Sequence, residues 1–271
     1  MVRKLLMCPP YYYNVGYYLQ NVHMNMSREV LHNKAQRQWI NLYNLLSYEL
    51  GAKVVLSPPS IGMMDMVFAA NAALVKDNRA VISNFSAESR KGETLAYKSV
   101  LEDLRKHISL YDYSFEGQGD ALFSHDKNIL WMGYGFRSTQ TSHSDVGNFL
   151  NVDPKKVISM LLLDPNFYHL DTCFCPLDNG HVMFYPSAFT SYGVDQIYKH
   201  FGKKNCILVD KEDASNFACN AISLNENVVL NKASDKLRCE LENFGYRVYE
   251  NDMSEFLLSG GSTKCSILHL N

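Results

Sequence analysis

Hydrophobic and polar residues follow two different periods along the chain, and the period changes repeatedly from one to the other. Four stretches carry apolar residues three or four positions apart, which is the spacing of one face of an α-helix. They cover residues 36–50, 93–107, 187–201 and 232–244, and two shorter helical stretches cover 144–150 and 253–258. Glycine follows three of the long stretches, at Gly51, Gly202 and Gly245. Because glycine readily ends a helix in a left-handed conformation, these positions predict helix ends.

Short apolar runs between the helical stretches predict β-strands, since strands favour β-branched and aromatic residues. They cover residues 53–56, 66–74, 80–83, 113–123, 129–135, 157–163, 170–175, 181–185, 206–209, 221–224, 228–230, 247–250 and 265–270. Asp178-Asn179-Gly180 separates two of these runs and predicts a hairpin turn. A strand pair, a helix and a strand recur about every 50 residues, roughly five times. The pattern indicates an α/β fold, built either from repeats or as a generic α/β domain.

The composition of the chain predicts a single soluble domain. No run of Gly, Pro or Ser is long enough to mark a linker, so we expect one domain over residues 1–271. Hydrophobic residues make up 46% and charged residues 20%, which allows a large core without disulfides or metal. The net charge is −2 without a basic stripe, which argues against nucleic acid as a partner. The apolar runs fall far short of the roughly 20 residues that span a bilayer, so no membrane partner is expected.

The chain holds seven cysteines, an odd number at irregular spacings. Residues 1–7 are too short to resemble a secretory signal. Together these features predict free thiols in a reducing, cytoplasmic setting.

Two motifs in the second half of the chain contain candidate catalytic residues. Gly260-Gly261 precedes Cys265, and paired glycines allow a close approach of the backbone to a ligand. Cys265 is therefore a candidate nucleophile, although a buried small hydrophobe is the ordinary alternative. His169 and Asp171 lie two apart at the start of a predicted strand, and residues two apart in a strand share one face. A histidine serves as general acid and base, while a carboxylate holds a cation.

Further polar residues lie at the ends of predicted strands. Glu116 and Asp120 enclose two glycines before an apolar strand, which suits a buried acid facing a ligand. Asp65 and Asn71 are six residues apart, so a regular strand would place them on one face. A plain turn and polar strand ends are the respective alternatives.

Two arginines complete the candidate set. Arg90 and Arg137 could each clamp a carboxylate with two parallel hydrogen bonds, and a surface charge is the alternative for each. Taken together, a thiol, an imidazole, several carboxylates and two arginines describe a pocket for an arginine-like molecule. The carboxylates would face its cationic end and the arginines its carboxylate end.

Four motifs in this order resemble the guanidino-group-modifying superfamily of arginine deiminases, dimethylarginine hydrolases, arginine dihydrolases and amidinotransferases. They are Cys-Pro-Pro at 8–10, Glu-Gly-x-Gly-Asp at 116–120, His-Leu-Asp at 169–171 and Gly-Gly-x-x-x-Cys at 260–265. The resemblance covers nearly the whole chain. It implies a five-fold pseudosymmetric α/β propeller, the pentein fold, in agreement with the recurring pattern. The Cys-Pro-Pro start is similar to the arginine dihydrolase branch.

The resemblance also implies a role for each catalytic candidate. Cys265 would be the nucleophile and His169 the general acid and base. Glu116 and Asp171 would hold the guanidinium, with Asp65 nearby. A bound guanidinium would place positive charge beside the thiol and lower its pKa.

The remaining candidates concern the substrate. Arg90 and Arg137 resemble the α-carboxylate clamps of the arginine-consuming members. Asn71 resembles the arginine dihydrolases, whereas deiminases tend to carry aspartate there. An amide adds an N–H donor that could hold the neutral ureido group of citrulline for a second hydrolysis. Asn21 begins the run Asn-Val-His-Met, which departs from the Asn-Pro-Trp-Met-like run of that branch, and we expect residues 11–25 to form a mobile gate over the pocket.

These observations predict a cysteine hydrolase that forms a covalent thiouronium intermediate and releases ammonia from arginine. The product is citrulline, with ornithine after a second hydrolysis as the dihydrolase-like outcome. No cofactor or metal is expected, and the partner is a small guanidino substrate. One alternative is a dimethylarginine dimethylaminohydrolase, a branch that usually lacks an acid at the position of Asp171. We also consider an amidinotransferase, for which the chain is short, a zinc-binding module and a non-catalytic propeller. The zinc ligands would be His169, Cys173, Cys175 and His181.

Overall fold

Five small sheets make up the β-structure of the residues that the structure describes. The computed structural model describes residues 2–15, 21–24, 28–125 and 128–271. In strand order the sheets are β15 (Leu268–His269), β1 (Lys4–Met7), β2 (Lys53–Leu56); β3 (Ala73–Lys76), β4 (Arg79–Ile82), β5 (His107–Ser109); β6 (Ala121–Phe123), β7 (Leu130–Tyr134), β8 (Val157–Leu161); β9 (Phe174–Pro176), β10 (Val182–Phe184), β11 (Cys206–Leu208); and β12 (Ile222–Leu224), β13 (Asn227–Leu230), β14 (Arg247–Glu250). In every sheet the first two strands pair antiparallel and the last two pair parallel.

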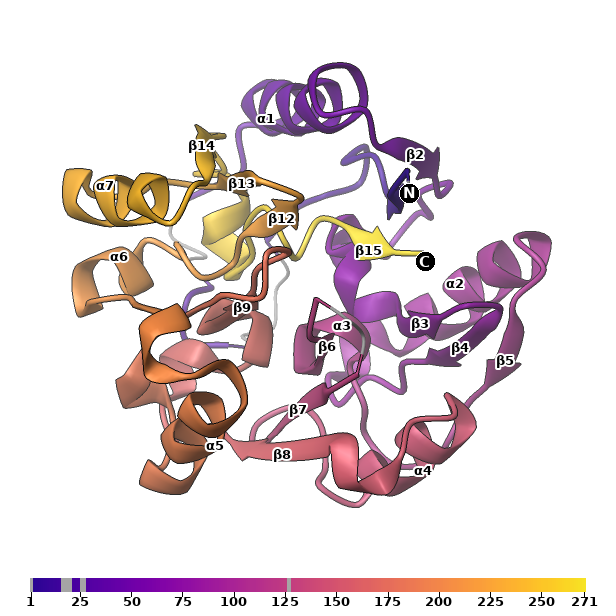
Figure 1. Cartoon of the computed structure of the whole chain (residues 1–271). Coiled ribbons are helices and arrows are strands. Elements are labelled where there is room, and N and C mark those ends of the chain that lie inside the picture. Colours follow the sequence, from indigo (N-terminus) through magenta and orange to yellow (C-terminus); the bar gives the residue numbers. More distant parts are fainter. Residues whose placement is uncertain (1, 16–20, 25–27, 126–127) are drawn as a thin grey trace.

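One helix links the middle strand to the parallel strand in each unit, because parallel strands require a crossover connection. These helices are α1 (His32–Asn44), α2 (Lys91–Asp103), α4 (Ser142–Phe149), α5 (Ser191–Phe201) and α7 (Asp235–Asn243). Figure 1 shows them at the periphery, with the sheets following one another around the interior. Two shorter helices, α3 (Gly117–Asp120) and α6 (Lys211–Ser215), precede β6 and β12. The chain is thus an α/β protein with mixed sheets.

The two ends of the described chain complete a single unit. The C-terminal strand β15 pairs antiparallel with β1, where Leu5 lies opposite His269 and Leu6 opposite Leu268. Figure 1 shows the N- and C-terminal ends close together. The first unit therefore depends on contacts across nearly the whole sequence.

Local sequence explains where the helices begin and end. The Thr190 hydroxyl accepts a hydrogen bond from the Gly193 N–H at the start of α5, and Ser234 caps α7 through the Leu237 N–H. Such caps satisfy backbone donors that the first helical turn leaves free. Gly202 ends α5 with φ of 78°. The predicted helices at 187–201 and 232–244 are confirmed in this way, with shorter bounds.

Apolar side chains fill the space between each helix and the sheets. On α1, for example, Ala35, Trp39 and Leu42 are buried in one cluster with Leu5 and Ile267. All seven cysteines are free thiols, and six of them are buried. In the described part of the chain, no helix has the length and apolar character needed to cross a membrane.

Four predicted strands are wrong in the same way. Residues 66–74 form two 3-10 turns, Met64–Val67 and Ala69–Ala72, and the strand begins only at Ala73. Residues 113–123 contain α3 before β6, residues 170–175 begin with the 3-10 turn Leu170–Thr172, and in 265–270 only β15 is extended. Each segment lies just before the first strand of a unit and is buried. Burial on every side removes the periodicity that separates a turn from a strand.

Candidate active site

The candidate residues lie on the turns that precede the first strands. Asn71 comes two residues before β3, Glu116 and His169 come five residues before β6 and β9, and Cys265 comes three residues before β15. These turns meet in the interior, where the Ala70 N–H donates to the Cys265 carbonyl at 3.0 Å. The common topology of the units therefore brings residues that are far apart in sequence to one place.

A cavity opens between these turns and measures about 290 Å³ together with the open space at its mouth. It is lined by Asn21, Asp65, Phe68, Asn71, Arg90, Arg137, Tyr168, His169, Ser259, Gly261 and Cys265. Seven of the nine predicted site residues are in this lining. The other two, Glu116 and Asp171, are fully buried behind His169 and Cys265. Strand geometry was wrong for two predicted pairs, Asp65 with Asn71 and His169 with Asp171, because turns carry all four residues.

Cys265 is held by an asparagine that the sequence did not single out. Its backbone N–H donates to Asn220 Oδ1 at 3.1 Å, and Asn220 Nδ2 lies 3.1 Å from the Cys265 Sγ atom. Asp171 Oδ2 accepts from the thiol at 3.5 Å. Burial raises the pKa of Cys265 well above the ordinary thiol value, and the Asp171 carboxylate raises it further. The group is consequently a thiol at neutral pH until a positive charge approaches it.

His169 is oriented by a buried carboxylate. Its Nε2 atom lies 2.8 Å from Glu116 Oε2. Burial by itself would raise the pKa of Glu116, but the His169 hydrogen bond and the charges of His169 and Arg137 hold it well below its usual range. A carboxylate only accepts hydrogen bonds, so Nε2 carries the proton. His169 Nδ1 has no hydrogen-bond partner among the described residues, and it is left for proton transfer at the cavity.

Glu116 is placed differently from the expectation that it holds the guanidinium. Its Oε1 atom accepts from the Ser86 N–H at 3.0 Å and from the Ser86 hydroxyl at 2.8 Å, while Oε2 faces His169. Arg137 lies 3.7 Å from Oε1. Both oxygens are thus engaged by protein groups, and the carboxylate lies one layer behind the cavity wall.

The amide of Asn71 has a fixed orientation. Arg90 NH1 donates to Asn71 Oδ1 at 3.0 Å, and a guanidinium can only donate, so the oxygen must face it. Asn71 Nδ2 has no hydrogen-bond partner among the described residues. A Cβ atom at Gly119 would lie only 2.3 Å from that nitrogen and 3.2 Å from the His169 ring. Glycine at 119 therefore makes room for both side chains.

Arg90 does not fit the expectation of a two-bond carboxylate clamp. Its Nε and NH2 donate to the two oxygens of Glu93 at 2.9 and 2.8 Å, and NH2 also donates to the Asp65 carbonyl at 3.2 Å. With the bond to Asn71, four of its five N–H groups are used by described residues. Glu93 engages Arg90 because it follows three residues later, in the first turn of α2. One N–H of Arg90 thus has no partner among the described residues.

Arg137 and Tyr168 form another part of the wall. The Arg137 guanidinium lies over the Tyr168 ring, 4.9 Å from its centroid, and Tyr168 donates to the Gly260 carbonyl at 2.7 Å. Gly260 has φ of 79°, and a Cβ atom there would lie 2.8 Å from Asn21 Oδ1. Asn21 Nδ2 donates to the Ser259 carbonyl at 2.9 Å, so the N-terminal segment is tied to the loop before Cys265.

The expected gate at 11–25 is described only in part, since residues 16–20 and 25 lie outside the described residues. Tyr13 at its start is buried, and its hydroxyl donates to the Glu255 carbonyl at 2.8 Å and lies 3.0 Å from Ser259 Oγ, whose own hydroxyl can donate to it. Its ring stacks on Phe256 at 4.8 Å. This beginning of the segment is anchored to the body of the protein.

Sequence reasoning missed Asn220, Tyr168, Phe68 and Ser259. A signal for Asn220 exists in the repeat, because Asn220 comes two residues before β12 as Asn71 comes two residues before β3. The other three lie outside the motifs that indicated the site.

The structure does not support the alternative of a zinc site at His169, Cys173, Cys175 and His181. Among the residues that the structure describes, no three His, Cys, Asp or Glu side chains gather closely enough to hold a metal ion. His169 faces Glu116, and His181 Nδ1 instead lies 2.9 Å from the Tyr246 hydroxyl. The two histidines of the zinc alternative therefore have other partners.

Known proteins resemble the chain over almost its full length. Residues 18–271 match the family described as N,N dimethylarginine dimethylhydrolase, eukaryotic. The bifunctional arginine dihydrolase/ornithine cyclodeaminase AgrE of Nostoc sp. is 40% identical over 276 residues, covering 98% of this chain and 38% of AgrE. The N(G),N(G)-dimethylarginine dimethylaminohydrolase of Mycobacterium tuberculosis is 34% identical over 269 residues, covering 99% of this chain and 86% of the relative.

Solved structures show the same fold. The N-terminal domain of ArgZ bound to substrate, an arginine dihydrolase from cyanobacteria, has a TM-score of 0.94 at 38% identity and covers 99% of this chain and 98% of that one. The chain spans less than two fifths of the full length of AgrE and ArgZ, 38% and 37%. By this likeness over nearly its whole length, the chain belongs to the N,N dimethylarginine dimethylhydrolase family of the guanidino-group-modifying superfamily, in the branch that includes the arginine dihydrolases.

Proposed function

We propose that this chain is an arginine dihydrolase, which converts arginine and two water molecules into ornithine, two ammonia and carbon dioxide. The observation that carries the proposal is the amide of Asn71. Its oxygen is held by Arg90, and its Nδ2 donor is left without a partner among the described residues beside the cavity. A donor at this position suits a neutral ureido oxygen and suits a cation poorly. The similarity to AgrE and ArgZ supports the same activity.

The first hydrolysis begins when the guanidinium binds beside Asp171 and Cys265. Its positive charge lowers the pKa of the buried thiol, and the thiol proton leaves for His169. The Cys265 sulfur attacks the guanidinium carbon. His169 then gives a proton from Nδ1 to the departing nitrogen, ammonia leaves, and a covalent thiouronium remains. Water, deprotonated by His169, releases citrulline and restores the thiol.

The second hydrolysis acts on citrulline, whose ureido group carries no charge. Asn71 Nδ2 would donate to the ureido oxygen and stabilise the negative charge that develops there as sulfur attacks. A second ammonia leaves through His169, and hydrolysis of the remaining carbonyl gives carbon dioxide and ornithine. A carboxylate at position 71 would instead favour the cationic guanidinium of arginine and repel the ureido oxygen of citrulline.

Substrate orientation rests on residues around the mouth of the cavity. Arg137 would hold the α-carboxylate, with the one remaining N–H of Arg90 as a second contact. Asn21 would contact the same end of the substrate, since it lies on the loop at 259–260. Glu116 would act by orienting His169, and Asp65 by adding negative charge near the guanidinium.

We further infer that the five units are the blades of a five-fold pseudosymmetric propeller and that residues 1–271 form a single catalytic domain. The identical strand order of the five sheets supports the first inference. The cavity supports the second, because its lining draws on residues from position 21 to position 265. A cytoplasmic location stays a prediction.

The experiment is a time course with L-arginine in which ammonia, citrulline and ornithine are all quantified. Two ammonia per ornithine, with citrulline only transient, would support the dihydrolase. One ammonia per citrulline would establish a deiminase instead. A Cys265→Ser variant serves as the control and should release nothing.

The second candidate is a dimethylarginine dimethylaminohydrolase, which the family description and the Mycobacterium tuberculosis relative favour. Incubation with asymmetric dimethylarginine separates the two, because this activity releases dimethylamine. Dimethylamine release without turnover of arginine would replace the dihydrolase proposal.

A further inference from the structure

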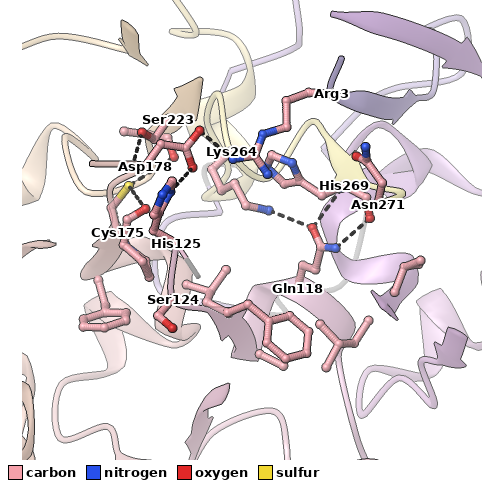
Figure 2. Close-up of a pocket in the computed structure, with 18 residues that line it drawn as sticks. Arg3, Gln118, Ser124, His125, Cys175, Asp178, Ser223, Lys264, His269 and Asn271 are labelled. Carbon is pink, nitrogen blue, oxygen red and sulfur yellow. Dashed lines mark hydrogen bonds and ion pairs between the residues drawn. The ribbon is translucent and has the colours of Figure 1, made fainter. Parts of the chain in front are cut away.

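A second and larger cavity lies on the other side of the turn that carries Cys265. With its mouth it measures about 740 Å³. Cys265 lines the first cavity, whereas the preceding residue, Lys264, lines the second. Gln118, two residues after Glu116, also lines it. Figure 2 shows the Lys264 amine reaching toward Gln118 across the middle of this cavity.

Lys264 is a buried amine with no carboxylate oxygen within 4.0 Å in the described part of the chain. Lys264 is only 6% exposed, and among the described residues it takes part in no ion pair within 4.0 Å. The Nζ atom has two long contacts to neutral oxygens, Gln118 Oε1 at 3.3 Å and the Ile267 carbonyl at 3.4 Å. Burial lowers the pKa of Lys264, and the more distant Asp171 and Cys265 offset this only in part, so an anion in this cavity would stabilise the charged form of the amine.

The other polar groups of the cavity also favour an anion. Arg3 lies at its edge and pairs with Asp178 at 2.7 Å, and Asp178 further accepts from the Asn225 N–H at 2.9 Å. Asp178, the one acidic side chain among the described lining residues, is thus already paired, while two basic side chains, Arg3 and Lys264, line the cavity. His125 lies 3.7 Å from Asp178 and can add positive charge when protonated.

The remaining wall is apolar. It is formed by Leu74, Val75, Ala121, Leu122, Phe123 and Phe174. A ligand that fills the cavity would therefore place an anionic group near Lys264 and a short hydrocarbon chain against this wall. An inorganic anion would leave the apolar wall uncovered.

We propose that this second cavity is a binding site for a small organic anion, a carboxylate on a short apolar chain, with Lys264 as its counter-charge. The site is separate from the catalytic cavity and does not depend on the proposed reaction. Because Lys264 and Cys265 are consecutive, the occupant contacts the turn that presents the thiol.

The test is isothermal titration calorimetry with three probes, hexanoate, its neutral analogue hexanamide, and inorganic phosphate. We expect hexanoate to bind at least about tenfold more tightly than hexanamide, since a hydrogen bond to a charged group contributes roughly that factor. Lys264→Met should remove this preference. Arg137→Gln, which alters the catalytic cavity, should retain it.

Three results would overturn the proposal. These are equal affinities for hexanoate and hexanamide, loss of hexanoate binding in Arg137→Gln with retention in Lys264→Met, and binding of phosphate without hexanoate. If circular dichroism shows that Lys264→Met does not fold, the test passes to Arg3 at the edge of the cavity, whose side chain is 24% exposed. Arg3→Gln removes one of the two cations and should weaken hexanoate several-fold, and an unchanged affinity would refute the site.

Discussion

Replacing Asn71 by aspartate should stop the reaction at citrulline. The new carboxylate can still accept from Arg90 NH1 at the position of Oδ1, 3.0 Å away, so the local structure should persist. The second oxygen would take the place of Nδ2 and face the cavity. For arginine this places a negative charge near a cation, whereas for citrulline it removes a donor and opposes the ureido oxygen.

The size of the effect follows from these two changes. The lost hydrogen bond to the ureido oxygen removes about 1 kcal/mol of transition-state stabilisation. The carboxylate oxygen that then faces the ureido oxygen costs about 1–3 kcal/mol more. Together they raise the barrier to citrulline hydrolysis by about 2–4 kcal/mol, or roughly 30- to 1000-fold. The arginine step should change much less.

The assay compares initial rates with arginine and with citrulline as separate substrates, and follows ammonia and ornithine. Asn78→Asp is the matched control, because it introduces the same charge at an exposed position. If the Asn71→Asp variant still forms ornithine at the wild-type rate, the amide has no part in the second hydrolysis.

The other predictions concern a glycine, a buried acid and the thiol. Gly119→Ala places a Cβ atom 2.3 Å from Asn71 Nδ2, so turnover should fall by at least about a hundredfold while the protein still unfolds cooperatively in urea. Burial raises the pKa of Asp120 to about 6, so the folded state binds its proton more tightly than the unfolded state. Its contribution to stability is therefore full below the ordinary Asp value and is lost as the pH rises through about 6, by as much as roughly 3 kcal/mol. Urea unfolding should accordingly show Asp120→Asn more destabilised, relative to wild type, at pH 4 than at pH 7. Because the pKa of Cys265 is raised, its alkylation by iodoacetamide in the absence of substrate should accelerate only at a pH above that of an ordinary thiol.

Each of these measurements has its own control. Gly92→Ala is the control for Gly119→Ala, because its Cβ atom would meet only the flexible end of Met63 at 3.1 Å and the variant should keep its activity. If Gly92→Ala also loses activity, the loss in Gly119→Ala cannot be assigned to the clash with Asn71. An equal stability difference at pH 4 and pH 7 would contradict the assignment of Asp120. The alkylation is read by peptide mass spectrometry in a Cys239→Ser background, since Cys239 is the exposed thiol. A fast reaction of Cys265 at neutral pH would refute a protonated thiol.

Much of the local structure could be predicted from the sequence because its causes are local. The helices over 187–201 and 232–244 carry their own caps and stops, and the Asp178-Asn179-Gly180 turn joins β9 to β10 as expected. The strands at 53–56 and 247–250 have the predicted bounds. Amphipathic period and turn chemistry are properties of neighbouring residues, so they can be read without knowing the fold.

The interior turns could not be predicted in this way. The segments at 66–74 and 170–175 are apolar because they are buried on all sides, and such burial looks the same for a turn and for a strand. The residue types at these positions still pointed to the site, although the strand geometry used to connect them was wrong.

The sequence by itself therefore determined which chemical groups the site contains and which local elements form. Only the tertiary structure decided how those groups are used. Arg90 is engaged by Glu93, Glu116 turns to His169 rather than to the cavity, and Asn220 supports Cys265. These partners come from different turns, and β15 closes the first unit against β1 at the other end of the chain. Hydrogen bonds between residues so distant along the chain depend on how the five units assemble, which is a property of the whole chain and of no single motif.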